Sequence, residues 1–71
     1  ARDYVAWFNV GWVQWQQNDL SEAEEAFYQS ARLSAAEPAF QSYALQHLAH
    51  IKYLRGQYEA AYDTGIRALN L

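Results

Sequence analysis

Apolar residues recur along the chain at helical spacing, in segments separated by short polar breaks. In the segment from about Asp3 to Gln17, apolar side chains fall three and four positions apart, as they do on one side of an α-helix. Asn18 and Asp19 then interrupt the pattern with turn-forming residues. No segment alternates apolar and polar residues with a period of two, so no strand is expected. The pattern predicts an all-α fold of four antiparallel helices.

The second helix is expected to begin at the sequence SEAE, residues 21–24. Ser21 followed three residues later by Glu24 has the spacing of a capping box, in which both side chains bond to the backbone of the first turn. The acidic residues of this turn also lie at the positive end of the helix dipole, and we expect them to be solvated. The helix should end near Leu33 or Ser34.

The third helix is expected to begin at Pro38, because proline has no N–H and fits the first turn, where N–H groups lack helical partners. It should continue to Arg55 and stop at Gly56, which adopts the left-handed conformation of a helix end without steric cost. A fourth helix is expected from about Tyr58 to Asn70. All connections are then short, which favours antiparallel neighbours.

The two halves of the chain resemble each other when Asn18 is aligned with Gly56, an offset of 38 residues. Large apolar residues then match large apolar residues, and small residues match small ones. The pairs include Trp7 with Leu45, Val10 with Leu48, Gly11 with Ala49 and Ala23 with Ala61. A repeated pair of helices is typical of a helical stack. It divides the single domain, residues 1–71, into repeat one at about 4–34 and repeat two at about 38–71.

The stretches WFNVGWVQ (residues 7–14) and AEEAF (residues 23–27) resemble the tetratricopeptide repeat, whose pattern reads W-x2-L-G-x2-Y and then A-x3-F. Residues 45–61 are similar but looser. The resemblance covers nearly the whole chain and implies an α–α superhelix of two helix-turn-helix units. It also implies that Gly11 lets two helices approach closely and that Phe27 fills the gap between one unit and its neighbour.

The chain departs from the family pattern in three ways, the first being that Gln14 and Lys52 stand where the family has tyrosine. The family period is about 34 residues; here four extra residues, PAFQ at 38–41, are expected to add about one turn to the start of the third helix. Gly65 stands at the position that matches Phe27, so the second unit lacks that large side chain. Because glycine is unfavourable within a helix, we expect either close approach by another helix or a partner's side chain filling the space.

Two neighbouring stripes run along the first helix, rotated by about 100° from each other. One contains Tyr4, Trp7, Gly11 and Gln14. The other contains Val5, Phe8, Trp12 and Trp15. The family resemblance implies that Trp7 and Val10 belong to the core and that the second stripe lines a concave groove for partner peptides. The matching residues of the third helix complete this candidate partner-binding groove: Tyr43, Gln46, His50 and Tyr53.

The groove positions favour an apolar partner. Family members that bind chaperone tails grip a carboxylate with Lys, Arg and Asn, and none of these types occupies the groove positions here. The resemblance therefore implies a non-catalytic protein-interaction module for an apolar or amphipathic peptide, a helix or another copy of the chain. One alternative is a structural, self-assembling helical scaffold, a homo-oligomer without a foreign ligand. Another is a small-molecule pocket lined by Trp12, Trp15, His50 and Tyr53.

Composition and charge further limit the class of protein to which the chain can belong. The 71 residues include no cysteine and are 52% hydrophobic, so helix packing or oligomerisation must stabilise the chain. The net charge is −3 and the five basic residues are scattered, which argues against nucleic-acid binding. No membrane-spanning stretch or signal-peptide pattern is present, which favours a soluble, cytoplasmic protein. The apolar last helix lacks the polar face of a solenoid end, so we expect a homodimer or packing on neighbouring repeats.

No catalytic or cofactor-binding pattern is present in the sequence. The serines have no local His–carboxylate arrangement, and no glycine-rich phosphate loop occurs. His47 and His50 have a spacing that can bring two ligands to one metal, but no third ligand lies nearby in sequence. We therefore expect no enzyme activity, no cofactor and no metal. His47 is expected at the surface, and His50 is expected to hydrogen-bond across the groove.

Overall fold

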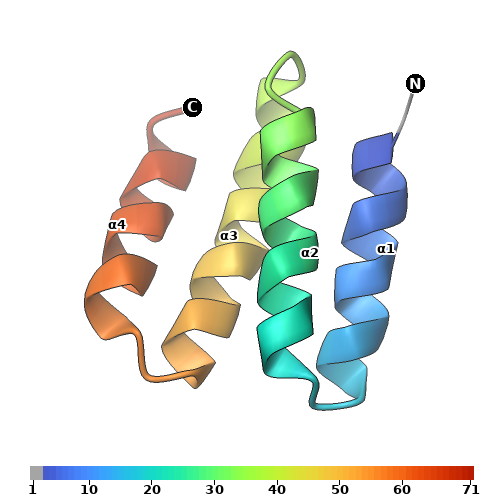
Figure 1. Cartoon of the computed structure of the whole chain (residues 1–71). Helices are drawn as coiled ribbons and strands as arrows, with labels where there is room; N and C mark the ends of the chain where they lie inside the picture. The colour runs from blue at the N-terminus through green and yellow to red at the C-terminus, as the bar shows by residue number, and fades with distance from the viewer. Residues whose placement is uncertain (1–2) are drawn as a thin grey trace.

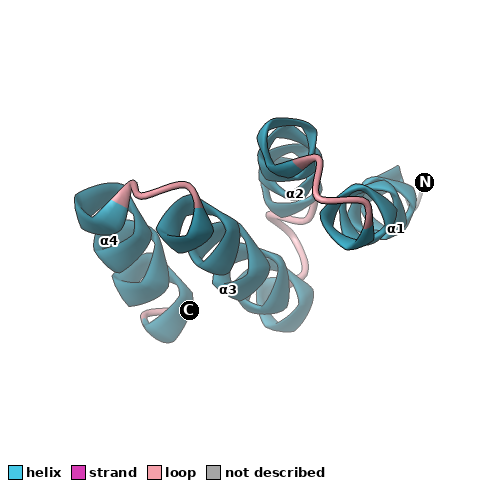
Figure 2. Cartoon of the chain, turned by 90° about the horizontal axis from the view of Figure 1, so that it is seen from below, coloured by secondary structure: helices cyan, strands magenta, loops and turns pink. Residues whose placement is uncertain are grey.

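The computed structural model describes residues 3–71, which form four α-helices and no strand. The helices are α1 (Asp3–Gln16), α2 (Leu20–Leu33), α3 (Pro38–Leu54) and α4 (Tyr58–Leu69). Each helix packs antiparallel on the next, so that α1 and α4 lie at opposite ends of the row (Figure 1). Seen along the helices, the α1–α2 hairpin stands beside the α3–α4 hairpin (Figure 2). The prediction of an all-α stack of helical hairpins is confirmed, with helix bounds within one residue of those expected.

The turns inside the two hairpins have the same backbone geometry. Asn18 and Gly56, aligned by the repeat, both adopt positive φ angles of 64° and 80°. The residues that follow them, Asp19 and Gln57, donate their N–H to the carbonyl five positions earlier, at 2.8 and 2.9 Å. This bond belongs to the Schellman motif, in which a left-handed residue closes a helix and reverses the chain. The left-handed conformation predicted for Gly56 is confirmed.

A serine hydroxyl joins the two helices of each hairpin. Ser30 Oγ on α2 donates to Tyr4 O on α1 at 2.7 Å, and Ser42 Oγ on α3 donates to Ala68 O on α4 at 2.9 Å. The offset of 38 residues relates position 4 to 42 and position 30 to 68. Both hairpins therefore have a hydrogen bond at the same pair of positions, with the donor and acceptor helices exchanged.

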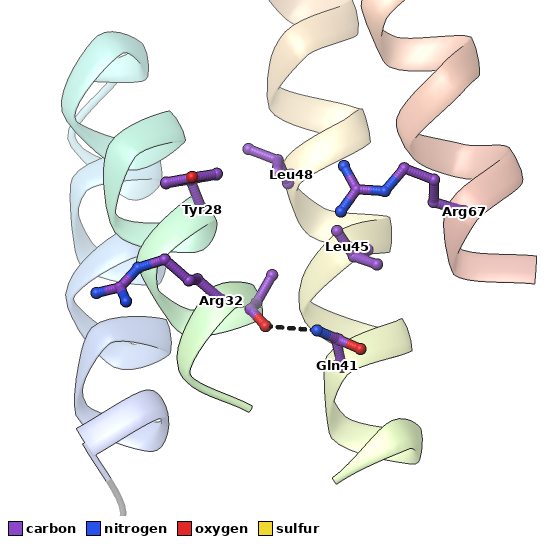
Figure 3. Close-up of a pocket in the computed structure, with 7 residues that line it drawn as sticks. Tyr28, Arg32, Gln41, Leu45, Leu48 and Arg67 are labelled. Carbon is purple, nitrogen blue, oxygen red and sulfur yellow. Dashed lines mark hydrogen bonds between the residues drawn. The ribbon is translucent and has the colours of Figure 1, made fainter. Parts of the chain in front are cut away.

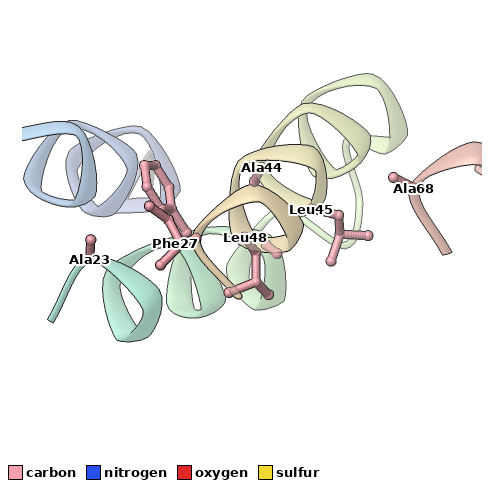
Figure 4. Packing of buried hydrophobic residues seen from close by; sticks show 8 residues of the cluster. Ala23, Phe27, Ala44, Leu45, Leu48 and Ala68 are labelled. Atoms are coloured by element: carbon pink, nitrogen blue, oxygen red, sulfur yellow. The ribbon is translucent and has the colours of Figure 1, made fainter. Parts of the chain in front are cut away.

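The core is one layer of small and apolar side chains between the helices (Figure 4). Its buried members are Ala23, Phe27, Ala31, Ala44, Leu45, Leu48, Ile51 and Ala68. Phe27 is fully buried, and a Cβ atom at Gly11 would lie only 3.0 Å from its ring. Glycine at position 11 is therefore what allows α1 to approach Phe27, as the resemblance implied.

The prediction that Trp7 and Val10 belong to the core is wrong, because they are 38% and 44% exposed. Their counterparts Leu45 and Leu48 are only 3% and 2% exposed. The difference in burial follows from the positions of the helices in the row. Helix α3 has α2 on one side and α4 on the other, whereas α1 has neighbouring helices on its inner side only (Figure 1). The same apolar stripe is thus buried in an inner helix and exposed in an end helix.

The predicted capping box at the start of α2 is not formed. Asp19 occupies the cap position, and no side chain caps the helix. Glu24 lies against α3 instead, where its carboxylate accepts hydrogen bonds from Lys52 Nζ at 2.9 Å and Arg55 Nη1 at 2.6 Å. The expectation of a solvated Glu24 is therefore wrong, since α3 places two cations beside it.

Gly65 has open space beside it: an added Cβ atom would meet nothing within 4 Å. Close approach by another helix of this chain, one of the two explanations expected for this glycine, is therefore wrong. The surrounding residues of α4 are also exposed, since Tyr62 and Ile66 are 70% and 38% accessible. The outer side of α4 is therefore an exposed apolar surface.

Gly11→Ala and Gly65→Ala are a matched pair of substitutions. Alanine is favoured over glycine within a helix by about 1 kcal/mol, so Gly65→Ala should raise the free energy of unfolding by about 0.5–1 kcal/mol. Gly11→Ala should lower it by about 1–2 kcal/mol, because the new methyl group would collide with the buried Phe27 ring. Urea denaturation followed by circular dichroism at low protein concentration measures both changes. Stabilisation by both substitutions would contradict the close contact at Gly11.

The Glu24 cluster predicts a loss of stability in acid. Burial raises the pKa of Glu24, but hydrogen bonds and charge from Lys52 and Arg55 together lower it below the ordinary value of 4.5. The carboxylate therefore stabilises the fold at neutral pH, and this contribution is lost as the pH falls below about 4.5 through the folded-state pKa. We expect Glu24→Gln to cost about 1 kcal/mol at pH 7 and much less at pH 3.

Urea titrations at the two pH values measure this effect. The matched control is Glu25→Gln, because within residues 3–71 the Glu25 carboxylate bonds only to Gln29 on its own helix. An equal loss for Glu24→Gln at both pH values would show that its charge is not what matters.

Candidate functional site

Aromatic rings from α1 and α3 meet along one side of the stack. We call this set the aromatic seam. Its residues are Tyr4, Phe8, Trp12 and Trp15 of α1, and Phe40, Tyr43, His47 and His50 of α3. The two helices are not consecutive in sequence, yet their rings approach to centroid distances near 5 Å, as in packed aromatic pairs. The seam therefore joins the first hairpin to the second.

Phe8 is the centre of the seam and is half-buried. Its ring stacks on Tyr43 with centroids 5.1 Å apart and an interplanar angle of 21°. It also presents edges to Phe27, at 5.2 Å, and to His47, at 4.8 Å. Phe8 thus fills the space between three helices, and its first role is packing between α1, α2 and α3.

The two seam tryptophans that follow Phe8 on α1 differ in exposure. Trp15 is half-buried and packs on His50 with centroids 5.2 Å apart. Trp12 presents its edge to Trp15 at 5.4 Å and is 45% exposed. Solvent therefore reaches the seam at Trp12, and it also reaches Tyr43, which is 49% exposed on α3.

A small hollow adjoins the tryptophan end of the seam, lined by Trp15, Gln46, His47 and His50, with a volume of about 250 Å³. Its walls combine one indole, two imidazoles and one amide. The Gln46 amide lies 3.4 Å from Ser42 Oγ and is exposed, so its polar atoms can reach a molecule in the hollow. The hollow is open to solvent and can accept a single side chain.

His47 belongs to the seam, although the sequence predicted that it would lie at the surface. Its ring is half-buried and lies against Tyr43, with centroids 4.6 Å apart, and against Phe8 and Phe27. Nδ1 lies 3.0 Å from Tyr43 O. Because a carbonyl oxygen only accepts, Nδ1 must carry the proton in this contact. The surface prediction for His47 is therefore wrong, and Nε2 is the nitrogen left for other interactions.

The expected hydrogen bond of His50 across the groove does not form. Within the described part of the chain, His50 makes an aromatic contact with Trp15 and no side-chain hydrogen bond. Val5 is half-buried on α1. Tyr53 is 57% exposed and packs on Tyr58 of α4, with centroids 5.4 Å apart, so it lies apart from the rings of the seam.

Most residues of α3 that face α1 are not the counterparts of the residues of α1 that face α3, although His50 corresponds to Trp12. Two equivalent neighbouring helices in a repeat touch through different faces, because each uses the side turned toward the other. Aligning the repeats therefore selects Tyr43 and His50, which lie in the seam, together with Gln46 and Tyr53, which do not. The helical spacing of Phe40, Tyr43 and His47 identifies the ring-bearing face of α3. Phe40 was also missed because it lies in the extra turn, which has no family counterpart.

Comparisons with family models, with characterised proteins and with solved structures found no match to this chain. None of the helices described is long and apolar enough to cross a membrane. Within residues 3–71, no group of three or more His, Cys, Asp or Glu side chains is arranged to hold a metal ion. The geometry of the seam is therefore the basis for assigning its role.

Phe8→Ala and Trp12→Ala test the stability contributions of a packed and of an exposed residue of the seam. A buried phenylalanine replaced by alanine costs about 3–5 kcal/mol, so the half-buried Phe8 should cost about 2–3 kcal/mol of unfolding free energy. Trp12→Ala should cost less than about 1 kcal/mol and leave the helical circular dichroism unchanged, because Trp12 touches only Trp15 among the rings of the seam. Urea denaturation measures both. A large loss of stability for Trp12→Ala would make Trp12 a core residue.

Proposed function

We propose that the chain is a non-catalytic protein-interaction module of two tetratricopeptide-like units. It binds an apolar or amphipathic helix at the exposed end of the aromatic seam. The observation that carries this proposal is the position of Trp12, which is 45% exposed beside the half-buried Trp15. Large aromatic side chains at an exposed but rigid site are typical anchors of protein interfaces.

The shape of the site supports a helix as the partner. A partner helix presents apolar side chains three or four positions apart on one face. One such side chain can enter the hollow beside Trp15, while the next lies flat on Trp12. The Gln46 amide and the imidazole of His50 at the edge of the hollow supply polar contacts to the partner's backbone or side chains.

A small-molecule site is less well supported. Binding pockets for such ligands usually have volumes of about 300–1,000 Å³ and enclose most of the ligand, whereas this hollow has about 250 Å³ and is open. Trp12 and Tyr53, which the sequence placed in such a pocket, do not line it. The self-assembling scaffold is favoured by a different observation, the exposed apolar sides of α1 and α4.

A displayed library of helical peptides tests the proposal. The library carries Leu, Phe or Trp at positions i, i+3 and i+7 and varies elsewhere, and selected peptides are titrated by calorimetry. We expect Trp12→Ala to weaken binding at least about 10-fold. The matched control is Tyr28→Ala, since Tyr28 is 49% exposed on α2 outside the seam, and it should change affinity less than about twofold. Peptides that bind wild type and Trp12→Ala equally would refute the proposed site.

A further inference from the structure

The two end helices of the row both carry exposed apolar surfaces, on sides of the molecule away from the seam. On α1, Trp7, Val10 and Val13 are 38%, 44% and 51% exposed. On α4, Tyr62, Ile66 and Leu69 are 70%, 38% and 79% exposed. A stack of helices that ends without a polar helix leaves such surfaces to be covered by another element.

The repeat indicates what fits these surfaces. The offset of 38 residues relates α2 to α4 and α3 to α1, so the junction between α2 and α3 corresponds to a junction between α4 and an added copy of α1. In the existing junction, Leu45, Leu48 and Ile51 are 3%, 2% and 0% exposed. Their counterparts on α1 are Trp7, Val10 and Val13, which are apolar at each position. The exposed side of α1 is therefore the side that α3 buries.

The ion pair between α2 and α3 corresponds to two neutral residues on the end helices α4 and α1. Glu24 of α2 bonds to Lys52 of α3. The positions that correspond to them are occupied by Tyr62 on α4 and Gln14 on α1. Gln14 Oε1 is buried and has no hydrogen-bond partner within residues 3–71. Because Gln14 Oε1 is closed off from solvent within its own copy, it would meet the Tyr62 hydroxyl of the next copy once the Gln14 side chain turns outward. Both groups are neutral, so no charge would be buried alone.

Side-chain size also matches across the ends. Between α2 and α3, Tyr28 faces Leu45 and Leu48 around a cavity of about 250 Å³ (Figure 3). The counterparts of Leu45 and of Ala31, which also lines this cavity, are the larger residues Trp7 and Leu69. Ile66 and Val10, the counterparts of Tyr28 and Leu48, are smaller, so Trp7 and Leu69 would fill the space that they leave between α4 and α1.

From these three correspondences we propose that copies of this chain associate head to tail. In this assembly, α1 of one copy packs on α4 of the next, in the arrangement that α3 has on α2. The contact joins two different surfaces, so it leaves one free surface at each end and does not close at two copies. The oligomers therefore grow with concentration, unlike the closed homodimer expected from the sequence.

One hydrogen bond of the existing junction is missing from the proposed contact. Gln41 Nε2 donates to Ala31 O at 2.9 Å (Figure 3). The corresponding side chain on α1 is Asp3, whose carboxylate only accepts and cannot donate to the carbonyl of Leu69. Asp3→Gln restores the donor, and it should strengthen association severalfold if the register is correct. Tyr62→Phe removes the hydroxyl that faces Gln14, and it should weaken association severalfold.

Sedimentation equilibrium of the 71-residue chain over a dilution series tests the proposal. The mean mass should rise with concentration beyond that of two copies. Val13→Lys blocks the α1 surface and Leu69→Lys blocks the α4 surface, and both positions are exposed, so each variant should keep the wild-type circular dichroism. Each variant alone should be monomeric. An equimolar mixture should form a dimer and stop there, because one free α4 surface meets one free α1 surface.

The matched control is Leu54→Lys, because Leu54 is 43% exposed near the end of α3 and lies on neither end surface. It should associate like the wild type. A wild-type chain that stays monomeric, or that stops at two copies, would refute head-to-tail association. So would self-association of either blocked variant, which would indicate a two-fold contact through one surface. Should Val13→Lys fail to fold, Tyr62→Phe and Asp3→Gln still test the register through opposite shifts in the association constant.

Discussion

Each helix in this structure is buried only where a neighbouring helix covers it, and the packing of α2 on α3 is the contact on which the arrangement depends. It joins the two hairpins beside the aromatic seam, and it brings Phe27 against His47 and Glu24 against Lys52. Because these helices lie in the middle of the row, their apolar stripes are covered on both sides. The same stripes on α1 and α4 are exposed at the ends.

The aromatic seam depends on this junction, since α1 and α3 come together only when α2 of the first hairpin packs on α3 of the second. Three seam residues that lie within two turns of α1 differ in how far they are buried. Phe8 is surrounded by rings from α2 and α3, Trp15 is half-buried against His50, and Trp12 has one ring neighbour. A site of this kind holds its exposed residues rigid, because the buried rings beside them fix the helix that carries them.

Polar groups distinguish the inner junction from the ends. The inner junction contains a carboxylate held by two cations, so an incorrect helix placed there would leave charge unpaired. The ends carry neutral groups at the matching positions, Tyr62 and Gln14. This difference favours the correct pairing of α2 with α3 during folding and leaves the ends free for a neutral contact.

The sequence by itself determined the four helices, the left-handed turn at Gly56 and the close approach of two helices at Gly11. These features depend on local spacing, on residues with special backbone freedom and on the match between two halves of one chain. Only the tertiary structure decided which stripe is buried, where Glu24 bonds and which residues of α3 face α1. Burial of Trp7 requires a helix on its outer side, and the contact of Glu24 requires cations more than 25 residues away in sequence. A periodic pattern shows that a helix has an apolar side, but the number and position of its neighbours determine whether that side becomes core or surface.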